Sequence, residues 1–247
     1  MTRLEMQTAV FDLLQSNSSG AGAGVWTPSE VQQYIRDYEL KLFVMIAGVH
    51  ENFFRTTTTL SEVAGTATVD LPTNNYRILE LERISGAGSS AVNPIPMVAI
   101  SRTSDARDHA RGTVLPIDSS GSRAYPVHFL THGQKQIELV PVPSVSVTNS
   151  LKLGYVYRPA AMTADSHVPF QLSAGTGGTG TDNLAEFHDI IVLGAAEKAM
   201  LKEEGYPQMD RIQSMRRERE AELVRYLKSM QVQGPRYIGA AEREFFW

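Results

Sequence analysis

Hydrophobic residues recur at helical spacing near the beginning of the chain. A short amphipathic helix is predicted from Arg3 to Gln15, and a long one from Thr27 to about Asn52. Thr27 can cap the long helix, Pro28 suits its first turn, and Glu30 completes a capping box three residues after the cap. The loop between these helices is rich in Ser, Gly and Ala.

The same spacing returns toward the end of the chain. One helix is predicted from Asn183, capped by Asp182 or Asn183, to the stop at Gly205-Tyr206-Pro207. A second runs from Gln208 to Met230. The first contains small residues that allow another helix, most simply the one after Thr27, to approach closely: Gly194, Ala195, Ala196 and Ala199.

Between these helical regions the pattern changes to the alternation typical of strands. Residues 55–63 and 67–71, joined by Ala64-Gly65, predict a β-hairpin. A second hairpin is predicted around His132-Gly133-Gln134. Further strands are expected at 76–84, at 148–157 and, as a proline-containing edge, at 94–100. The middle of the chain is therefore expected to be an antiparallel β-domain.

The predicted fold class is α+β. The N- and C-terminal helices, residues 1–53 and 183–230, form one helical layer, because neither part can bury its apolar stripe alone. The antiparallel β-domain, 54–159, is inserted between them, and 160–182 form a flexible Gly/Thr linker. Residues 231–247 form an extended C-terminal docking tail.

Charge, cysteine content and hydropathy argue against several classes of protein. The formal net charge of -4 argues against a protein that grips nucleic acid, since phosphate neutralisation needs a basic surface. The absence of cysteine excludes disulfides, thiolate metal sites and cysteine nucleophiles. The N-terminus lacks the pattern of a signal peptide, and no apolar run has the length of a membrane span.

The sequence contains no strong catalytic or metal-binding motif. Gly175 to Gly180 fits the G-x-G-x-x-G pattern, but no clear strand precedes it and no second strand follows, so a flexible linker is the expected structure. The histidines form no metal-ligand motif, although His128 and His132 flank a hairpin. We therefore expect no catalytic residue, no metal and no cofactor; a nucleotide-dependent enzyme using the glycine loop is the hypothesis that remains if this is wrong.

The helix after Gln208 contains a run of charges of alternating sign. One interpretation is a solvated face with i,i+4 ion pairs, and the other is a seam between subunits. The second deserves testing because two of the arginines interrupt the apolar stripe. The subunit-interface candidates are Arg216, Arg217, Glu218, Arg219, Glu220 and Glu222.

The chain ends in exposed aromatic residues. A frayed terminus is one interpretation. Consecutive exposed aromatics reduce solubility and are typical of docking anchors, so docking is favoured. The predicted docking residues are Tyr237, Ile238, Phe245, Phe246 and Trp247.

In the order of its elements and in four segments, the chain resembles the head-to-tail adaptor (connector) proteins of tailed bacteriophages, especially short-tailed ones. The segments are Trp26 to Val31 opening the long helix, Leu71-Pro72 with the strand Tyr76 to Ile84, the strand Leu151 to Pro159, and the helix Leu184 to Ala196.

The resemblance implies a virion structural protein at the head-tail junction, assembled in the host cytoplasm without a membrane. It implies a dodecameric ring below the portal, whose helices frame the channel through which DNA passes without being held. The β-domain would face a tail component, either a nozzle or a tail-tube protein. The C-terminal segment would reach the portal protein, in agreement with the aromatic anchor.

The alternative is a β-rich receptor- or sugar-binding component of the tail. In that case Tyr125, Tyr155 and Tyr157 would lie exposed on one face of a sheet.

Overall fold

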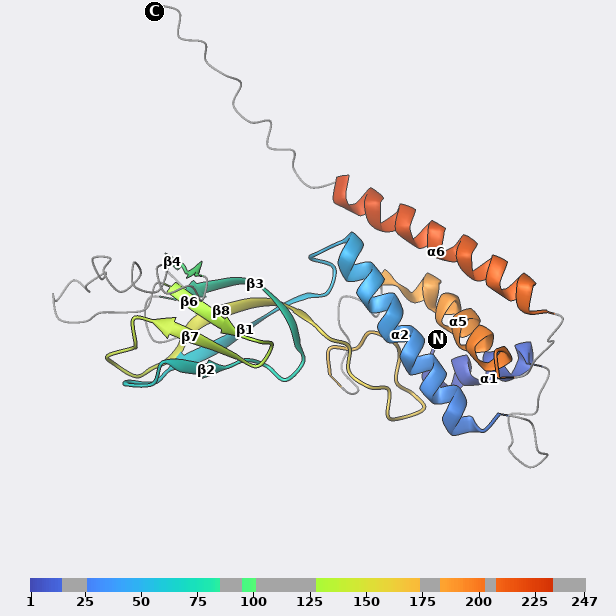
Figure 1. Cartoon of the computed structure of the whole chain (residues 1–247), viewed down its shortest axis with the longest axis horizontal. Coiled ribbons are helices and arrows are strands. Elements are labelled where there is room, and N and C mark those ends of the chain that lie inside the picture. Colours follow the sequence, from blue (N-terminus) through green and yellow to red (C-terminus); the bar gives the residue numbers. More distant parts are fainter. Residues whose placement is uncertain (15–25, 85–94, 101–127, 174–182, 203–207, 233–247) are drawn as a thin grey trace, which may run out of the picture. The chain divides into compact units, whose positions relative to one another are not determined.

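A computed structural model describes residues 1–14, 26–84, 95–100, 128–173, 183–202 and 208–232. The chain divides into two compact units, which we call the helical unit (residues 1–50 and 184–247) and the β unit (residues 51–183). The fold class is α+β, as predicted (Figure 1).

Two capping boxes begin the N-terminal helices of the helical unit. Helix α1 spans Arg3–Leu13, with Thr2 and Glu5 bonded reciprocally at its start. Helix α2 spans Pro28–Val49, and its capping box is the predicted one, formed by Thr27 and Glu30. Each box satisfies two backbone N–H groups that a helix start leaves without partners. Helix α2 ends at Val49, three residues before the predicted limit of about Asn52. Its C-cap, His50, has an extended backbone.

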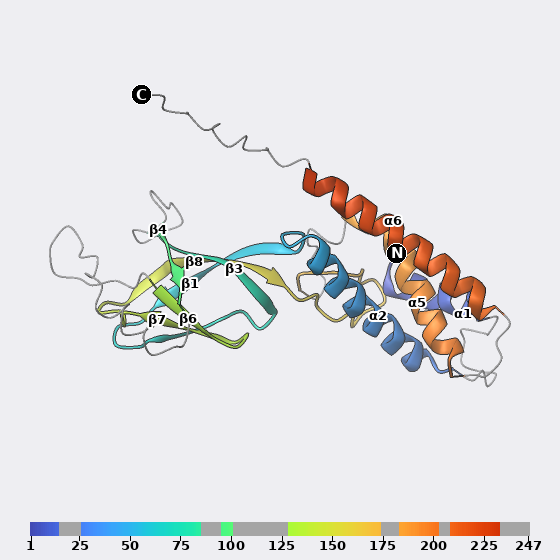
Figure 2. The same ribbon diagram turned by 45° about the horizontal axis from the view of Figure 1, so that its top comes forward.

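The C-terminal helices pack on α2. A 3₁₀ turn, η1 (Ala185–Phe187), leads into α5 (His188–Met200), and α6 follows at Met209–Val232. The predicted cap of α5 is wrong: its N-cap is Phe187 without a side-chain bond, because the 3₁₀ turn comes first. In both ribbon views α6 lies alongside α5, and α5 contacts α1, α2 and α6 (Figure 2).

The small residues of α5 allow the close packing that the sequence predicted. A Cβ atom added to Gly194 would lie 2.2 Å from the ring of Tyr38 on α2. Ala195, Ala196 and Ala199 are fully buried. The indole Nε1 of Trp26, just before α2, donates to the Ala199 carbonyl at 2.8 Å, which fixes the start of α2 against the end of α5.

The first sheet of the β unit has the order β1-β8-β3-β4. Its strands are β1 (Arg55–Glu62), β3 (Asn75–Arg83), β4 (Ile95–Pro96) and β8 (Val147–Tyr157). All three pairings are antiparallel. Strand β8 is central, and its side chains Leu151, Leu153 and Val156 are fully buried.

The second sheet has the order β2-β7-β6-β5. Its strands are β2 (Thr68–Asp70), β5 (Val98–Ala99), β6 (His128–His132) and β7 (Gln136–Val140). Strands β6 and β7 form the predicted hairpin, whose turn contains Gly133 at φ +66°. The β unit was predicted to be antiparallel throughout. Strand β5 departs from this prediction, because it pairs with β6 in parallel.

The hairpin predicted over residues 55–71 is wrong. A tight turn is present, with Gly65 at φ +74° and the Thr66 N–H bonded to the Val63 carbonyl. However, β1 pairs with β8 in the first sheet and β2 with β7 in the second. A turn signal reports only that the chain reverses, whereas the eleven-residue β8 provides a longer apolar partner for β1 than the three-residue β2 does.

The described part of the predicted edge segment, residues 95–100, lies at the sheet edges, as Pro96 indicated, whereas Pro94 falls outside the described residues. Strand β4 ends the first sheet and β5 ends the second, so the chain passes from one sheet to the other at Met97. Proline is tolerated at such positions because an edge strand needs fewer backbone donors.

Part of the segment predicted as a linker is packed. Phe170 is fully buried, its ring lies 5.6 Å from that of Phe54, and the Tyr157 hydroxyl donates to the Phe170 carbonyl at 3.0 Å. The loop of residues 16–24, the polar turn at 101–111, the Gly175–Gly180 stretch, the Gly205 stop and nearly all of the tail fall outside the described residues.

Candidate interaction surfaces

The charge run of α6 contains a buried arginine. Arg216 is 8% exposed, and its guanidinium bonds to residues of two other helices. Its Nε donates to Glu197 Oε2 on α5 at 2.5 Å, and its Nη1 donates to the Tyr38 hydroxyl on α2 at 2.9 Å and to Glu220 Oε1 at 2.7 Å. The Tyr38 hydroxyl in turn donates to Glu220. We call Tyr38, Glu197, Arg216 and Glu220 the arginine clamp.

Each of the four side chains of the arginine clamp is bonded to another member of the clamp, and these bonds change the pKa values of Tyr38 and Arg216. Burial raises the pKa of Tyr38 above its ordinary value, and the hydrogen bond to Glu220 adds to this effect, so the hydroxyl remains a donor. Burial alone would lower the pKa of Arg216, but the hydrogen bond to Glu197 and the neighbouring groups raise it overall. A buried cation whose partners are all in place stabilises one helix arrangement and is costly to disturb.

Arg219 makes a second, more exposed set of contacts one turn along α6. Its Nε donates to Asp189 on α5 at 2.7 Å, and its Nη2 donates to the Glu186 carbonyl at 2.8 Å. Glu222 accepts from its Nη1, and its guanidinium lies 5.4 Å from the centre of the Phe187 ring. The hydrogen bond to Asp189 is the main reason why the pKa of Arg219 is raised.

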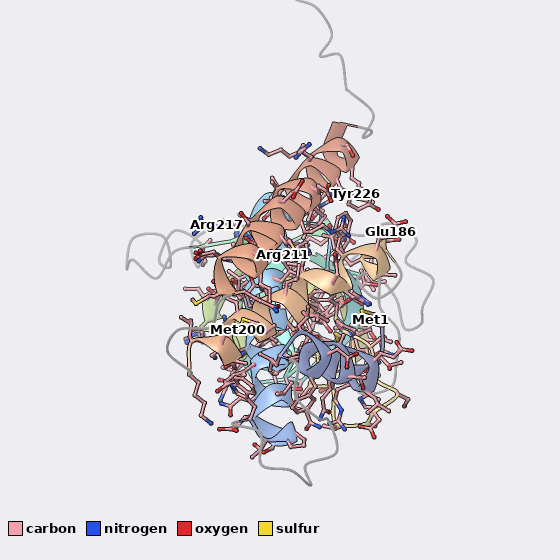
Figure 3. The ribbon with its side chains drawn as sticks, turned by 90° about the vertical axis from the view of Figure 1, so that its right-hand side faces the viewer. Met1, Glu186, Met200, Arg211, Arg217 and Tyr226 are labelled. Atoms are coloured by element: carbon pink, nitrogen blue, oxygen red, sulfur yellow. The ribbon has the colours of Figure 1, made fainter. Side chains whose placement is uncertain are left out.

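The six candidate seam residues therefore divide into two groups. Arg216, Arg219, Glu220 and Glu222 make ion pairs or hydrogen bonds inside the helical unit. Arg217 and Glu218 are exposed. Arg217 and Tyr226 lie on opposite sides of α6 in Figure 3, and the Tyr226 ring packs on Phe187. The outer side of α6 is thus the part of the charge run that is available to another molecule.

Sequence reasoning missed the partners of these arginines. The apolar spacing of α2 included Tyr38, but the sequence pattern singled out neither Glu197 nor Asp189. The one available signal was Gly194: a glycine within an otherwise apolar helix indicates close approach by a bulky side chain, here the Tyr38 ring.

A surface groove of about 260 Å³ lies between α2 and α5, beside Tyr38 and Gly194. Its charged groups balance one another: Lys198 pairs with Asp37, Glu197 pairs with Arg216, and Lys41 lies 4.9 Å from the centre of the Tyr38 ring. A groove of balanced charge selects neither an anionic nor a cationic ligand.

The tyrosines that the receptor-binding alternative requires on the surface are buried. Tyr155 is 5% exposed and Tyr157 is 1% exposed, and both hydroxyls donate within the β unit, to Asn74 and to the Phe170 carbonyl. Burial also raises the pKa of Tyr155. Tyr125 falls outside the described residues. Sugar-binding faces present aromatic rings to solvent, so this arrangement counts against the alternative.

The described residues contain no group of three His, Asp or Glu side chains placed to hold a metal ion. His132 instead pairs with Glu138 across the β6–β7 hairpin at 2.9 Å. Within the same part of the chain, no helix has both the length and the apolar content needed to cross a membrane. All five predicted docking residues of the tail lie beyond residue 232, outside what the structure describes.

The fold and its charged contacts define an α+β protein whose buried ion pairs hold helices together. The chain matches the family described as "SU10 adaptor protein" over residues 1–244, and it belongs to that family. It is therefore a phage adaptor protein of the virion head-tail junction, as the resemblance in sequence indicated. A search of curated proteins gave no match.

Proposed function

We propose that this protein forms a ring that joins the portal to the tail and continues the DNA channel. The observation that carries the proposal is the family match over almost the whole chain. The net charge of -4 agrees with it, because a channel through which DNA must move should not bind phosphates tightly. On this proposal the ring is dodecameric, and a nozzle or tail-tube protein lies below it.

The seam between subunits in this proposal includes the outer side of α6. Arg217 and Glu218 are exposed there, next to arginines that are already held within the chain. A cyclic ring uses two different surfaces on each copy, so exchanging the charges on one of them should weaken the ring. Native mass spectrometry of the purified protein should detect the ring, and of an R217E/E218R variant should detect a smaller fraction of it.

The contact with the portal is assigned to the tail, residues 231–247. The test is a pull-down of the purified portal protein by the full chain and by a chain that ends at residue 230. A sharper variant changes Phe245, Phe246 and Trp247 to Ala, since aromatic anchors contribute most of the binding free energy in many interfaces. The matched control changes Glu242 and Glu244 to Ala and should bind normally. Undiminished binding by the shortened chain would refute the docking role.

A further inference from the structure

Among the residues that the structure describes, strand β1 is the long open edge of the first sheet. It contains eight residues, Arg55–Glu62, and of the described strands it pairs only with β8. The other edge strands of the described residues are much shorter: β2 has three residues, and β4 and β5 have two each. Strand β4 also includes Pro96, which has no N–H to donate.

The register shows which backbone groups of β1 face outward. The Tyr157 N–H bonds to the Phe54 carbonyl, and the Cα partners pair Thr56 with Tyr155 and Leu60 with Leu151. In an antiparallel ladder, alternate residues direct both N–H and C=O toward the same neighbour. Phe54, Thr56, Thr58 and Leu60 therefore bond to β8. The N–H and C=O groups of Thr57 and Thr59 point away from it, and we call these four groups the β1 edge.

The β1 edge lacks the usual protection against pairing. Thr56–Leu60 is regular and contains four consecutive threonines, which favour extended backbone, and it includes neither proline nor a charged residue; Arg55, just before it, pairs with Glu80. The register irregularity of this strand comes only after Leu60. Proteins commonly block exposed edges with such features, so their absence from Thr56–Leu60 leaves this edge available for pairing.

The side chains of β1 on the core-facing side of the sheet are also only partly covered. On the core-facing side, Leu151, Leu153 and Tyr155 of β8 are buried, whereas Thr56, Thr58 and Leu60 of β1 are only half-buried. A strand added beyond β1 would cover these three side chains. On the opposite side Thr57 and Thr59 are exposed, so the added strand would be polar there.

We propose that the β1 edge receives an extended segment of another protein of the virion, which adds a strand to the first sheet. The segment would be about five residues long and would make about four backbone hydrogen bonds with Thr57 and Thr59. Its residues would alternate, with small apolar or β-branched side chains on the core-facing side and polar ones on the other. This inference rests on the proposed function for its choice of partner.

A second copy of this chain is a poorer occupant. Two β1 edges would pair about a two-fold axis, which a cyclic ring of equivalent copies does not contain. Pairing of β1 with a different edge of the next copy would use a strand of only two or three residues among those described. A segment from another protein meets neither obstacle.

Hydrogen exchange of individual amides tests the inference directly. In the free protein the amides of Thr57 and Thr59 should exchange rapidly, while those of Thr56 and Thr58, which bond to β8, should exchange slowly. In purified virions the Thr57 and Thr59 amides should slow by about a hundredfold. Rapid exchange in virions would overturn the inference. Protection in a homo-oligomer of the purified protein alone would overturn it too, because the occupant would then be a second copy.

A pair of variants at one position supplies the second measurement. T57P removes an N–H that the sheet does not use, so the variant should fold, whereas T57V keeps the N–H. T57P should reduce stable incorporation of the partner about fivefold to tenfold relative to T57V. T58P removes a donor to β8 and should destabilise the β unit, which checks the register. Equal incorporation by T57P and T57V would contradict the inference.

The identity of the partner follows from cross-linking. The chain has no cysteine, so T59C gives a single thiol for a short photo-activated cross-linker. Cross-links in virions should reach one extended segment of another virion protein; cross-links to a second copy would overturn the inference. The outcomes remain separate from those of the proposed function. If the ring forms and binds the portal but the β1 edge stays unprotected in virions, only this inference fails.

Discussion

Gly194 is a position where a single methyl group should disturb the packing of two helices. Its added Cβ would lie 2.2 Å from the Tyr38 ring, and the Tyr38 hydroxyl is held by Glu220 and Arg216, so the ring cannot easily move. We expect G194A to lower the free energy of unfolding by about 1–3 kcal/mol. Urea denaturation followed by circular dichroism measures the change.

The matched control is Gly48 of α2. An added Cβ there meets nothing within 4 Å, so G48A should be neutral or should raise the free energy of unfolding by about 0.5 kcal/mol through helix propensity. If both variants behaved alike, the assignment of Gly194 to close packing would be wrong.

His188 should make the stability depend on pH. Its ring is buried, and burial lowers its pKa from 6.5 to about 4, with a further contribution from the Met1 ammonium, whose nitrogen lies 2.9 Å from Nδ1. Between these two pKa values the unfolded chain binds a proton that the folded chain does not. The stabilisation is therefore present above pH 6.5 and is lost as the pH falls toward 4, by roughly 3 kcal/mol in total.

H188Q isolates this effect from the titration of carboxylates. The difference in unfolding free energy between the wild-type protein and H188Q should change by about 1.4 kcal/mol per pH unit between pH 6.5 and 4. Urea denaturation at several pH values measures it. Parallel curves for the two proteins would mean that His188 titrates normally in the folded state.

At the scale of elements, the arginine clamp should be the main polar attachment of α6. R216M would leave the half-buried carboxylates of Glu197 and Glu220 without their cation, and we expect it to lower the free energy of unfolding by about 3 kcal/mol. R217M changes the next residue, which is exposed, and should stay within about 0.5 kcal/mol of the wild-type value. Thermal denaturation of both variants compares them, and equal melting temperatures would contradict the clamp.

Elements with a local signal could be predicted from the sequence. The capping box of Thr27 and Glu30, the spacing of α2 and α6, the small residues of α5 and the β6–β7 hairpin all depend on residues close together in the chain. Pairings over long separations could not be predicted. The β1–β8 pair joins Arg55 to Val156, and the parallel β5–β6 pair joins Val98 to His128, and no local pattern identifies either partner.

The candidate surfaces also combine features that a local sequence pattern predicts with features that depend on distant parts of the chain. The charge run on α6 was visible as a pattern, but its residues separate into Arg216, which is buried, and Arg217, which is exposed, only when α2 and α5 are in place. The β1 edge was hidden for a different reason. A strand becomes an edge through the order of the sheet, which depends on β8, about ninety residues later.

At the scale of the whole molecule, the β unit is one continuous segment, whereas the helical unit is formed by two segments distant in the chain. All the strand pairings of β1 to β8 lie within residues 51–183. Residues 51–183 expressed alone should therefore fold, with the circular dichroism of a β-protein and one cooperative unfolding transition. A fragment without cooperative unfolding would show that the β unit needs the helices.

The helical unit should behave in the opposite way. Residues 1–50 alone lack the Ala199 carbonyl, which accepts a hydrogen bond from the Trp26 indole, and they lack α5, against which Tyr38 of α2 packs. Each of the fragments 1–50 and 184–232 should be largely unfolded alone, and mixing them should restore helical signal in proportion to complex formation, because the buried stripe of each covers the other. Introducing G194A into the second fragment should weaken this association, which would link the complementation to the same close contact that defines the packing of α2 on α5.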